Sequence, residues 1–424
     1  MVVLRCAVCD TAVDISTPLS WKCPRATETD RSHVLAFQDD RREVSVADST
    51  NSFLRYQRNL YVDAFGEALG IPENERGRII ADADAAVKRI DGTGFVISPF
   101  QREDQLSEEL GFSQEGGVWV KDETRNVAGS HKARHIFTEL IHLLFAEHAG
   151  RTPWVTPELR PPLAIASCGN AAIAASTLAA SANWPISVFV PVSASEHVLG
   201  ILQSLNARVV TCPRRDDDPP GDPCVHRFRE AVANGAIPFG VQGTENVWCL
   251  DGGRTLGWEM AQTQSDLDRV FIQVGGGAFA SCVGSAFAST SPHTALHTVQ
   301  AEGCAPLARA WDNAMKSGGT RDAGHRWSQC MWPWENEPRS LADGILDDET
   351  YDWISVLNAM TDSGGSPVVA TEDQVVNALA VAQRTTSIAV SPTGTAGLAG
   401  LLAMREQIGD NEKVAVVFSG VLRR

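Results

Sequence analysis

The stretch Lys121-Asp-Glu-Thr-Arg-Asn-Val-Ala-Gly-Ser-His-Lys132 joins a segment typical of a strand to a segment typical of a helix. Residues 117–120 before it are Gly-Val-Trp-Val, and the residues after it carry apolar side chains at helical spacing. Ser130 suits the N-cap of this helix, so Lys132 falls in the first turn. The positive end of the helix dipole disfavours a cation there and favours a neutral, imine-forming amine. Alone, the segment also fits a solvated lysine at a helix start.

Strands and helices alternate through the chain beyond this segment. Expected strands cover residues 163–167, 186–191, 207–212, 270–274, 297–301, 367–370 and 413–418. Strands that alternate with helices of this length predict an α/β fold of parallel sheets with right-handed crossovers. The 424 residues suffice for two or three packed domains.

Three further strand-to-helix junctions carry unusual residues. They are Ser167-Cys168-Gly169-Asn170 (the asparagine loop), Gly275-Gly276-Gly277-Ala278 (the glycine loop) and Phe418-Ser419-Gly420. The asparagine loop offers an amide at a helix start, although a plain N-cap would look the same. The glycine loop leaves successive N–H groups free to surround a phosphate, although a tight turn also uses glycine. Because ligands of open parallel sheets bind at the carboxyl ends of strands, we expect these junctions to converge with Lys132.

The composition excludes several classes of protein. The formal net charge of -16 argues against nucleic acid or an anionic membrane as the main partner. No apolar run approaches the ~20 residues that span a bilayer. The first residues, Met-Val-Val-Leu-Arg-Cys, are too soon interrupted for a secretory signal, so we expect a cytoplasmic protein. Ten cysteines in a chain of this length do not form a disulfide framework.

Residues 1–48 differ in character from the rest, and the end of this segment overlaps a polar linker expected at residues 40–50. Cys6 and Cys9 form a CxxC pair, and Cys23 follows after a polar stretch. A zinc ribbon would place its fourth ligand at position 26, which is Ala26. A closed site would need His33 or an acidic residue to complete it. We therefore interpret this segment as a decayed ribbon and predict no metal ligand.

In order and spacing, the imine lysine, the two loops and the terminal hydroxyl together resemble pyridoxal-phosphate enzymes of the tryptophan-synthase-β type (fold type II). Within them, the chain resembles the threonine synthase and threonine/serine dehydratase branch over roughly residues 51–420. Gly129-Ser-His-Lys132 is similar to the family's Ser-Phe-Lys-Asp motif, with His131 for Phe and Ala133 for Asp. The asparagine loop is similar to the Ser-x-Gly-Asn loop, and Ala278 replaces the usual last glycine of the phosphate loop. The N-terminal cysteines and Arg55-Tyr56 resemble threonine synthases.

The resemblance implies two parallel-sheet three-layer domains with the cofactor cleft between them, plus a small ribbon-like N-terminal lobe. We divide the chain into the lobe (1–48), a core with the lysine helix and a smaller mobile sheet (49–245), and a larger α/β domain (246–424). The larger domain would hold the phosphate loop and a tryptophan-rich irregular insertion at 315–348. A homodimer is also implied.

The resemblance further assigns roles to single residues. Lys132 would carry pyridoxal 5'-phosphate covalently, and Asn170 would bond the ring 3′-oxygen. Backbone N–H groups of the glycine loop would hold the phosphate: Gly275, Gly276, Gly277 and Ala278. Ser419 would face the pyridine nitrogen, with Thr393 as second choice. The substrate carboxylate would lie on Ser167, Cys168, Gly169 and Ser130.

A neutral hydroxyl at the pyridine nitrogen makes the ring a weaker electron sink, which favours elimination or replacement over transamination. We therefore expect a lyase (ammonia-lyase or dehydratase) that uses Lys132 as base for α,β-elimination on a small hydroxy amino acid such as serine or threonine. A threonine-synthase-like or β-replacement transferase is the first alternative. Its phosphorylated substrate would need a second cationic cluster, for which Lys121, Arg125 and Arg134 are the candidates. The chain also lacks that branch's Gly-x-Gly-Leu-Lys tail after Ser419.

Two other classes stay open. The replacements at 131, 133 and 278 are compatible with a cofactor-binding relative without catalysis. An unrelated sugar- or nucleotide-binding α/β protein would show no visible imine absorbance.

Overall fold

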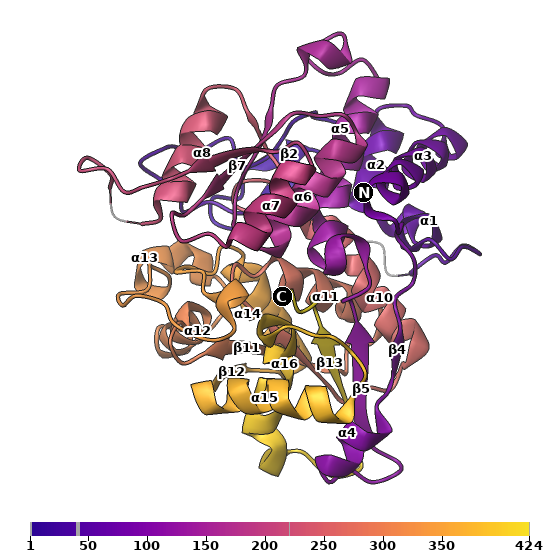
Figure 1. Cartoon of the computed structure of the whole chain (residues 1–424), viewed down its shortest axis with the longest axis vertical. Coiled ribbons are helices and arrows are strands. Elements are labelled where there is room, and N and C mark those ends of the chain that lie inside the picture. Colours follow the sequence, from indigo (N-terminus) through magenta and orange to yellow (C-terminus); the bar gives the residue numbers. More distant parts are fainter. Residues whose placement is uncertain (1, 40–42, 220, 424) are drawn as a thin grey trace.

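The computed structural model describes residues 2–39, 43–219 and 221–423, so positions 40–42 of the expected linker lie outside the described part. Two lobes stack along the long axis of the molecule (Figure 1). Each lobe is built around its own sheet of mainly parallel strands. The fold is the predicted α/β architecture.

The large sheet has six strands. In spatial order they are β12 (Pro367–Ala370), β11 (Ala295–Ala301), β10 (Arg269–Gln273), β13 (Lys413–Phe418), β5 (Gly117–Asp122) and β4 (Phe100–Arg102). All pair in parallel except β4, which is antiparallel to β5. Alternate residues of these strands enter two separate apolar cores, as the two-residue repeat of a strand requires. The sheet is therefore covered on both faces.

One face carries α10 (Arg254–Thr263), α11 (Ala278–Thr290) and α14 (Trp353–Ser363), and the other carries α15 (Glu372–Thr385) and α16 (Pro392–Met404). The remaining helices are α4 (Asp104–Glu109) beside β5 and α15, α9 (Cys249–Gly252) between α5 and α11, and α12 (Pro306–Lys316) with α13 (Trp327–Cys330) beside β12 and α14.

The small sheet has four strands, all parallel. Its order is β8 (Arg208–Thr211), β7 (Ile186–Val190), β6 (Leu163–Ala166) and β9 (Ile237–Pro238). Its helices are α5 (Lys132–His148), α6 (Asn170–Ser181), α7 (Glu196–Ser204) and α8 (Pro223–Ala233), with α1 (Ser52–Arg55), α2 (Tyr61–Ala68) and α3 (Glu73–Asp91) outside them. The core beneath α8 is separate from the core shared with α5 and α6, so this lobe also has three layers.

The large sheet takes β4 and β5 from before residue 245, so a division at 245/246 does not separate the two sheets. The N-terminal segment folds as an antiparallel sheet ordered β2 (Ala12–Asp14), β1 (Val3–Cys6), β3 (Leu35–Gln38). It packs against the core that contains α5. Among the described residues, no helix combines the length and apolarity needed to cross a membrane.

The tryptophans of the 315–348 insertion have packing roles. Arg309 lies over the rings of Trp332 and Trp334, 4.0 and 5.2 Å from their centroids. Trp327 meets Trp353 edge-on at 5.3 Å. The end of the insertion, beyond these rings, runs along the glycine loop.

Candidate active site

The start of α5 contacts the end of β13 and the first turn of α11 in the other lobe. The backbone N–H of His131 donates to the carbonyl of Ser419 at 3.1 Å, and Ser130 forms a β-bridge with Gly420. The His131 ring lies 4.1 Å from that of Phe279, in the first turn of α11. The predicted convergence of the lysine helix, the last strand and the glycine loop is confirmed.

Lys132 is the first residue of α5 and is half-buried. Burial lowers the pKa of its ammonium group, and the nearby negative charge of Asp347 partly opposes this. The predicted N-cap was wrong: His131 precedes the helix, and Ser130 is extended because its backbone pairs with Gly420. The Ser130 hydroxyl is buried and has no hydrogen-bond partner among the described residues, which leaves it available to a ligand.

His131 is a neutral buried ring. Its Nδ1–H donates to the Ser419 carbonyl at 3.1 Å, and burial lowers its pKa well below the usual value. The side chain therefore ties the start of α5 to the end of β13.

Asn170 begins α6, as expected, and Gly169 is its N-cap. The Gly169 N–H donates weakly to Ser167 Oγ at 3.4 Å, and Cys168 is exposed. Arg423, which the sequence reasoning missed, donates from Nε to Asn170 Oδ1 at 3.2 Å. Because Arg423 occupies this oxygen, the NH₂ group of Asn170 remains as the donor for a ring oxygen. Only the position of Arg423, four residues after Ser419, hinted at this role.

The glycine loop already holds an anion. A Cβ on Gly275 would lie 2.3 Å from Asp347 Oδ2, and one on Gly276 would lie 2.9 Å from Tyr351. Gly277 has a φ of 101°, which favours glycine. The Asp347 carboxyl lies against the Gly276 N–H, which acts to lower the pKa of that carboxyl, but burial outweighs this and raises the pKa to about 6. A glycine loop at the N-terminus of a helix that has room for a carboxylate beside its N–H groups can also bind a phosphate.

The Ser419 hydroxyl accepts a hydrogen bond from Gln273 Nε2 at 2.7 Å. Its own hydrogen therefore remains available for another acceptor. Thr393 donates to Asp343 Oδ1 at 3.1 Å and accepts from the Gly344 N–H at 3.0 Å, so its hydrogen is already used. Gln273 is a further residue the sequence analysis missed, although it stands two positions before the glycine loop.

Comparison with known proteins decides the family. A family model described as pyridoxal-phosphate dependent enzyme matches residues 94–420. The chain belongs to this family. Its cofactor is pyridoxal phosphate, as the resemblance implied, and the site fits it: burial lowers the pKa of Lys132, and the glycine loop packs against the Asp347 carboxyl.

The relatives include two activities. The chain is 27% identical to a threonine synthase of Methanosarcina acetivorans over 77% of this chain and 74% of that protein. It is 24% identical to a biosynthetic L-threonine dehydratase of Haemophilus influenzae over 76% of this chain and 56% of that protein. The solved structure of processed threonine deaminase isoform 2 from Solanum lycopersicum shares the fold, with a TM-score of 0.61 and 19% identity over 83% of this chain and 86% of that one.

Two of the three candidate cations are held in a buried ion cluster. Lys121 Nζ lies 2.6 Å from Glu259 Oε2, and Arg134 bridges Glu259 and Glu123 at 2.7 and 2.9 Å. All four side chains are nearly inaccessible to solvent. Arg125 is exposed. Lys121 and Arg134 are therefore not available to bind a substrate phosphate.

We expect the Asp347→Asn variant to bind pyridoxal phosphate roughly tenfold or more tightly than the wild type at pH 8. The variant removes a negative charge from beside the glycine loop, and its repulsion of the cofactor phosphate should cost ~1.4 kcal/mol or more of binding free energy. Since the pKa of Asp347 is raised to about 6, the wild-type carboxyl is neutral below that pH and charged above it. The advantage of the variant should therefore shrink as the pH falls from 8 to 5. Fluorescence titration of the apoprotein with pyridoxal phosphate at each pH measures the affinity gain and its pH dependence.

Asp348→Asn is the matched control, because it removes the neighbouring charge and keeps the carboxylate on the Gly276 N–H. If wild type and Asp347→Asn bound pyridoxal phosphate equally at pH 8, the Asp347 carboxylate would not compete with the cofactor phosphate for the glycine loop.

Proposed function

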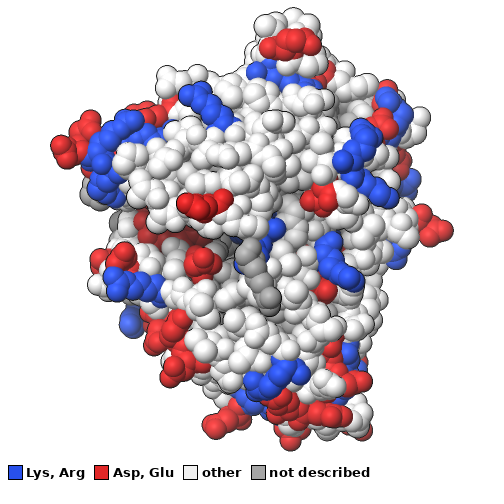
Figure 2. Space-filling model, viewed as in Figure 1, with Lys and Arg blue, Asp and Glu red and all other residues white. Residues whose placement is uncertain are grey.

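We propose that the chain catalyses α,β-elimination on a small hydroxy amino acid such as serine or threonine, releasing a 2-oxo acid and ammonia. The observation that carries this proposal is the acidic character of the site surroundings. Acidic side chains gather in a hollow between the two lobes (Figure 2). A substrate with a dianionic phosphate would be repelled there, whereas a hydroxy amino acid brings one carboxylate only.

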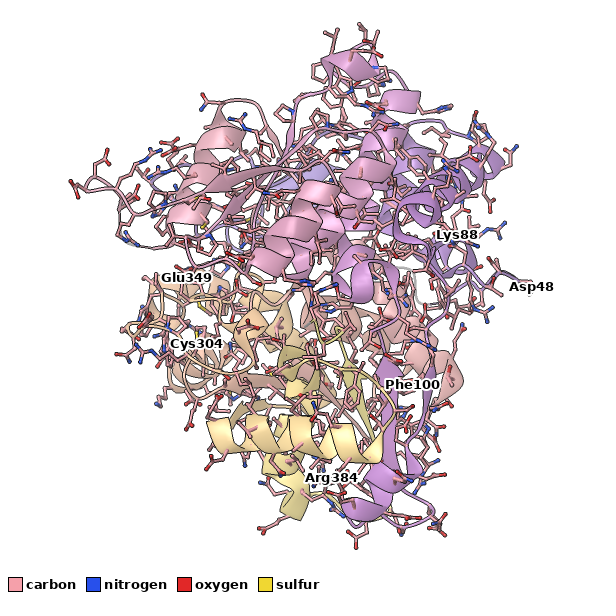
Figure 3. The ribbon with its side chains drawn as sticks, in the orientation of Figure 1. Asp48, Lys88, Phe100, Cys304, Glu349 and Arg384 are labelled. Atoms are coloured by element: carbon pink, nitrogen blue, oxygen red, sulfur yellow. The ribbon has the colours of Figure 1, made fainter. Side chains whose placement is uncertain are left out.

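The acidic side chains come from both lobes. Asp347, Asp348 and Glu349 are consecutive and half-buried, and Glu349 lies at the edge of the lower lobe that faces the upper one (Figure 3). Burial and then the charge of Asp348 raise the pKa of Glu349. Asp222, at the N-cap of α8 in the upper lobe, adds negative charge at Asp347 and Asp348. Arg229 lies near this group but is paired with Glu245 at 2.6 Å.

The chain offers few groups for the substrate's single carboxylate. The N-terminus of α6 presents the backbone N–H groups of the asparagine loop, and the Arg423 guanidinium lies beside Asn170. The Ser130 hydroxyl faces no other partner among the described residues. These groups are sufficient to orient one small amino acid.

The residues of the chain divide the chemistry among them. Bound pyridoxal phosphate supplies an electron sink for negative charge at the substrate Cα. The Lys132 amine, whose pKa is lowered by burial, removes the Cα proton. Ser419 offers only a neutral hydroxyl donor to the pyridine nitrogen, which makes the cofactor ring a weaker electron sink. A weaker sink favours expulsion of the β-hydroxyl group of the substrate.

An assay with serine, threonine and O-phosphohomoserine tests the proposal. Keto acid from serine or threonine, with no threonine formed from O-phosphohomoserine, is the expected result. Threonine formed from O-phosphohomoserine would overturn it. Reversible spectral change with amino acids but no product would instead indicate a non-catalytic relative.

A threonine-synthase-like replacement is the second candidate. The similarity to the threonine synthase of Methanosarcina acetivorans favours it. Against it stand the buried pairing of Lys121 and Arg134 and the acidic residues around the site.

A further inference from the structure

We propose that the N-terminal lobe binds a structural zinc ion through Cys6, Cys9, Cys23 and His33. The sulfur and nitrogen atoms of these four residues lie within 4.8 Å of one another. Cys6 Sγ is 3.5 Å from His33 Nδ1, and Cys9 Sγ is 3.6 Å from Cys23 Sγ. A tetrahedral zinc with Zn–S near ~2.3 Å and Zn–N near ~2.0 Å separates its ligand atoms by about 3.5–3.8 Å. These two atom pairs thus already have the spacing of a zinc shell, and the four atoms together lie close enough for small side-chain movements to complete it.

The fold of the lobe creates this spacing. Cys6 ends β1, and the turn after it returns the chain through Asp10, whose φ is 57°. The Asp10 N–H donates to the Cys6 carbonyl at 3.1 Å, which brings Cys9 back beside Cys6. β3 pairs with β1 so that Cys6 lies opposite Leu35, two residues after His33. Backbone pairing therefore supplies the fourth ligand that position 26 lacks.

A second observation concerns the other nitrogen of His33. Its Nε2 lies 3.5 Å from the carboxylate of Asp30. A carboxylate on this side favours the tautomer with its hydrogen on Nε2, which leaves Nδ1 with the lone pair that a metal needs. Cys6, Cys23 and His33 are buried, and none of the cysteines is in a disulfide. Four protein ligands around a closed position are typical of a structural zinc rather than a catalytic one.

The site is connected to the lysine helix. The segment just before Cys23 donates and accepts three hydrogen bonds with the main body of the protein. Leu19 N–H donates to His142 Nε2 of α5 at 3.3 Å, Trp248 Nε1–H donates to the Ser20 carbonyl at 3.1 Å, and Val247 N–H donates to the Trp21 carbonyl at 2.8 Å. Metal at Cys23 would therefore order the segment that supports the back of α5.

Metal analysis of full-length protein purified from zinc-supplemented medium under reducing conditions tests the proposal. We expect one zinc per chain, and cobalt exchange should give the intense visible bands of a tetrahedral thiolate site. Asp30→Asn keeps all four ligands and should weaken zinc binding about 10–100-fold. His33→Ala should lose the metal, whereas Cys330→Ala, which removes a buried cysteine of another lobe, should keep it.

Wild-type protein without zinc, a Cys9–Cys23 disulfide in freshly reduced protein, or full zinc retention in His33→Ala would overturn the proposal. Should a variant fail to fold, chelation of the wild type provides the test. Loss of zinc should lower its melting temperature, and zinc but not magnesium should restore it. Cofactor absorbance at Lys132 is recorded separately, so this result does not depend on the proposed reaction.

Discussion

Lys132→Ala is expected to abolish both the visible imine absorbance of the bound cofactor and turnover, with activity falling at least about 10³-fold. The variant loses the amine that we propose as the attachment point of the cofactor and as the base that removes the substrate proton. Its unfolding free energy should change by less than about 1 kcal/mol, because a half-buried amine with a depressed pKa contributes little to stability. Absorbance spectra, turnover and urea unfolding measure the three quantities.

Borohydride reduction identifies the residue directly. In wild-type protein, peptide mapping should place the pyridoxyl label on Lys132. Lys88→Ala is the matched control, because Lys88 is an exposed lysine of α3 and lies on the opposite side of the molecule from Glu349 in the view of Figure 3. A reducible label that persists in Lys132→Ala would remove the basis of the proposed mechanism.

Glu259→Gln is expected to destabilise the fold by about 3–5 kcal/mol, the cost of breaking a buried ion pair. The cluster balances Lys121 and Arg134 against Glu123 and Glu259, so the variant leaves one buried positive charge without a counter-charge. Burial acts to raise the pKa of Glu259, but Arg134 and then Lys121 outweigh it and lower the value to about 2. Urea unfolding at pH 7 measures the loss.

The pH dependence has a defined sign. Because the folded pKa of Glu259 lies below its ordinary value of 4.5, its contribution is fully present above pH 4.5 and is lost as the pH falls toward about 2. Neutral pH is therefore the right condition for the comparison.

Glu109→Gln is the matched control, because Glu109 pairs with Arg384 at the surface of the lower lobe (Figure 3). This exposed pair should contribute less than about 1 kcal/mol. Equal losses in the two variants would show that the buried cluster does not stabilise the start of α5.

Local patterns were sufficient to predict which segments meet at the candidate site. Helical spacing after Lys132, the glycine at the start of α6 and three glycines before α11 are short-range signals, and all three junctions meet as predicted. The prediction of Ser130 as the N-cap was wrong because the backbone of Ser130 pairs with Gly420, 290 positions further along the chain. A cap preference of about 1 kcal/mol is easily outweighed by such a long-range pairing.

Other contacts had no local signal. Arg423 beside Asn170, Gln273 beneath Ser419 and Asp347 on the glycine loop join residues far apart in sequence. Lys121 and Arg134 are close enough in sequence to Lys132 to be candidates for binding a substrate phosphate, but their burial in ion pairs assigns them to the scaffold.

By itself, the sequence determined the α/β class and pointed to Lys132 and to the loops proposed to hold the cofactor, because each depends on residue types within one turn of chain. Tertiary structure alone decided which charges face the site and which are neutralised inside the protein. It also decided that His33 stands beside three cysteines. The physical reason is that electrostatic and metal-ligand interactions depend on distances through space, which strand pairing and helix packing fix only when the whole chain has folded.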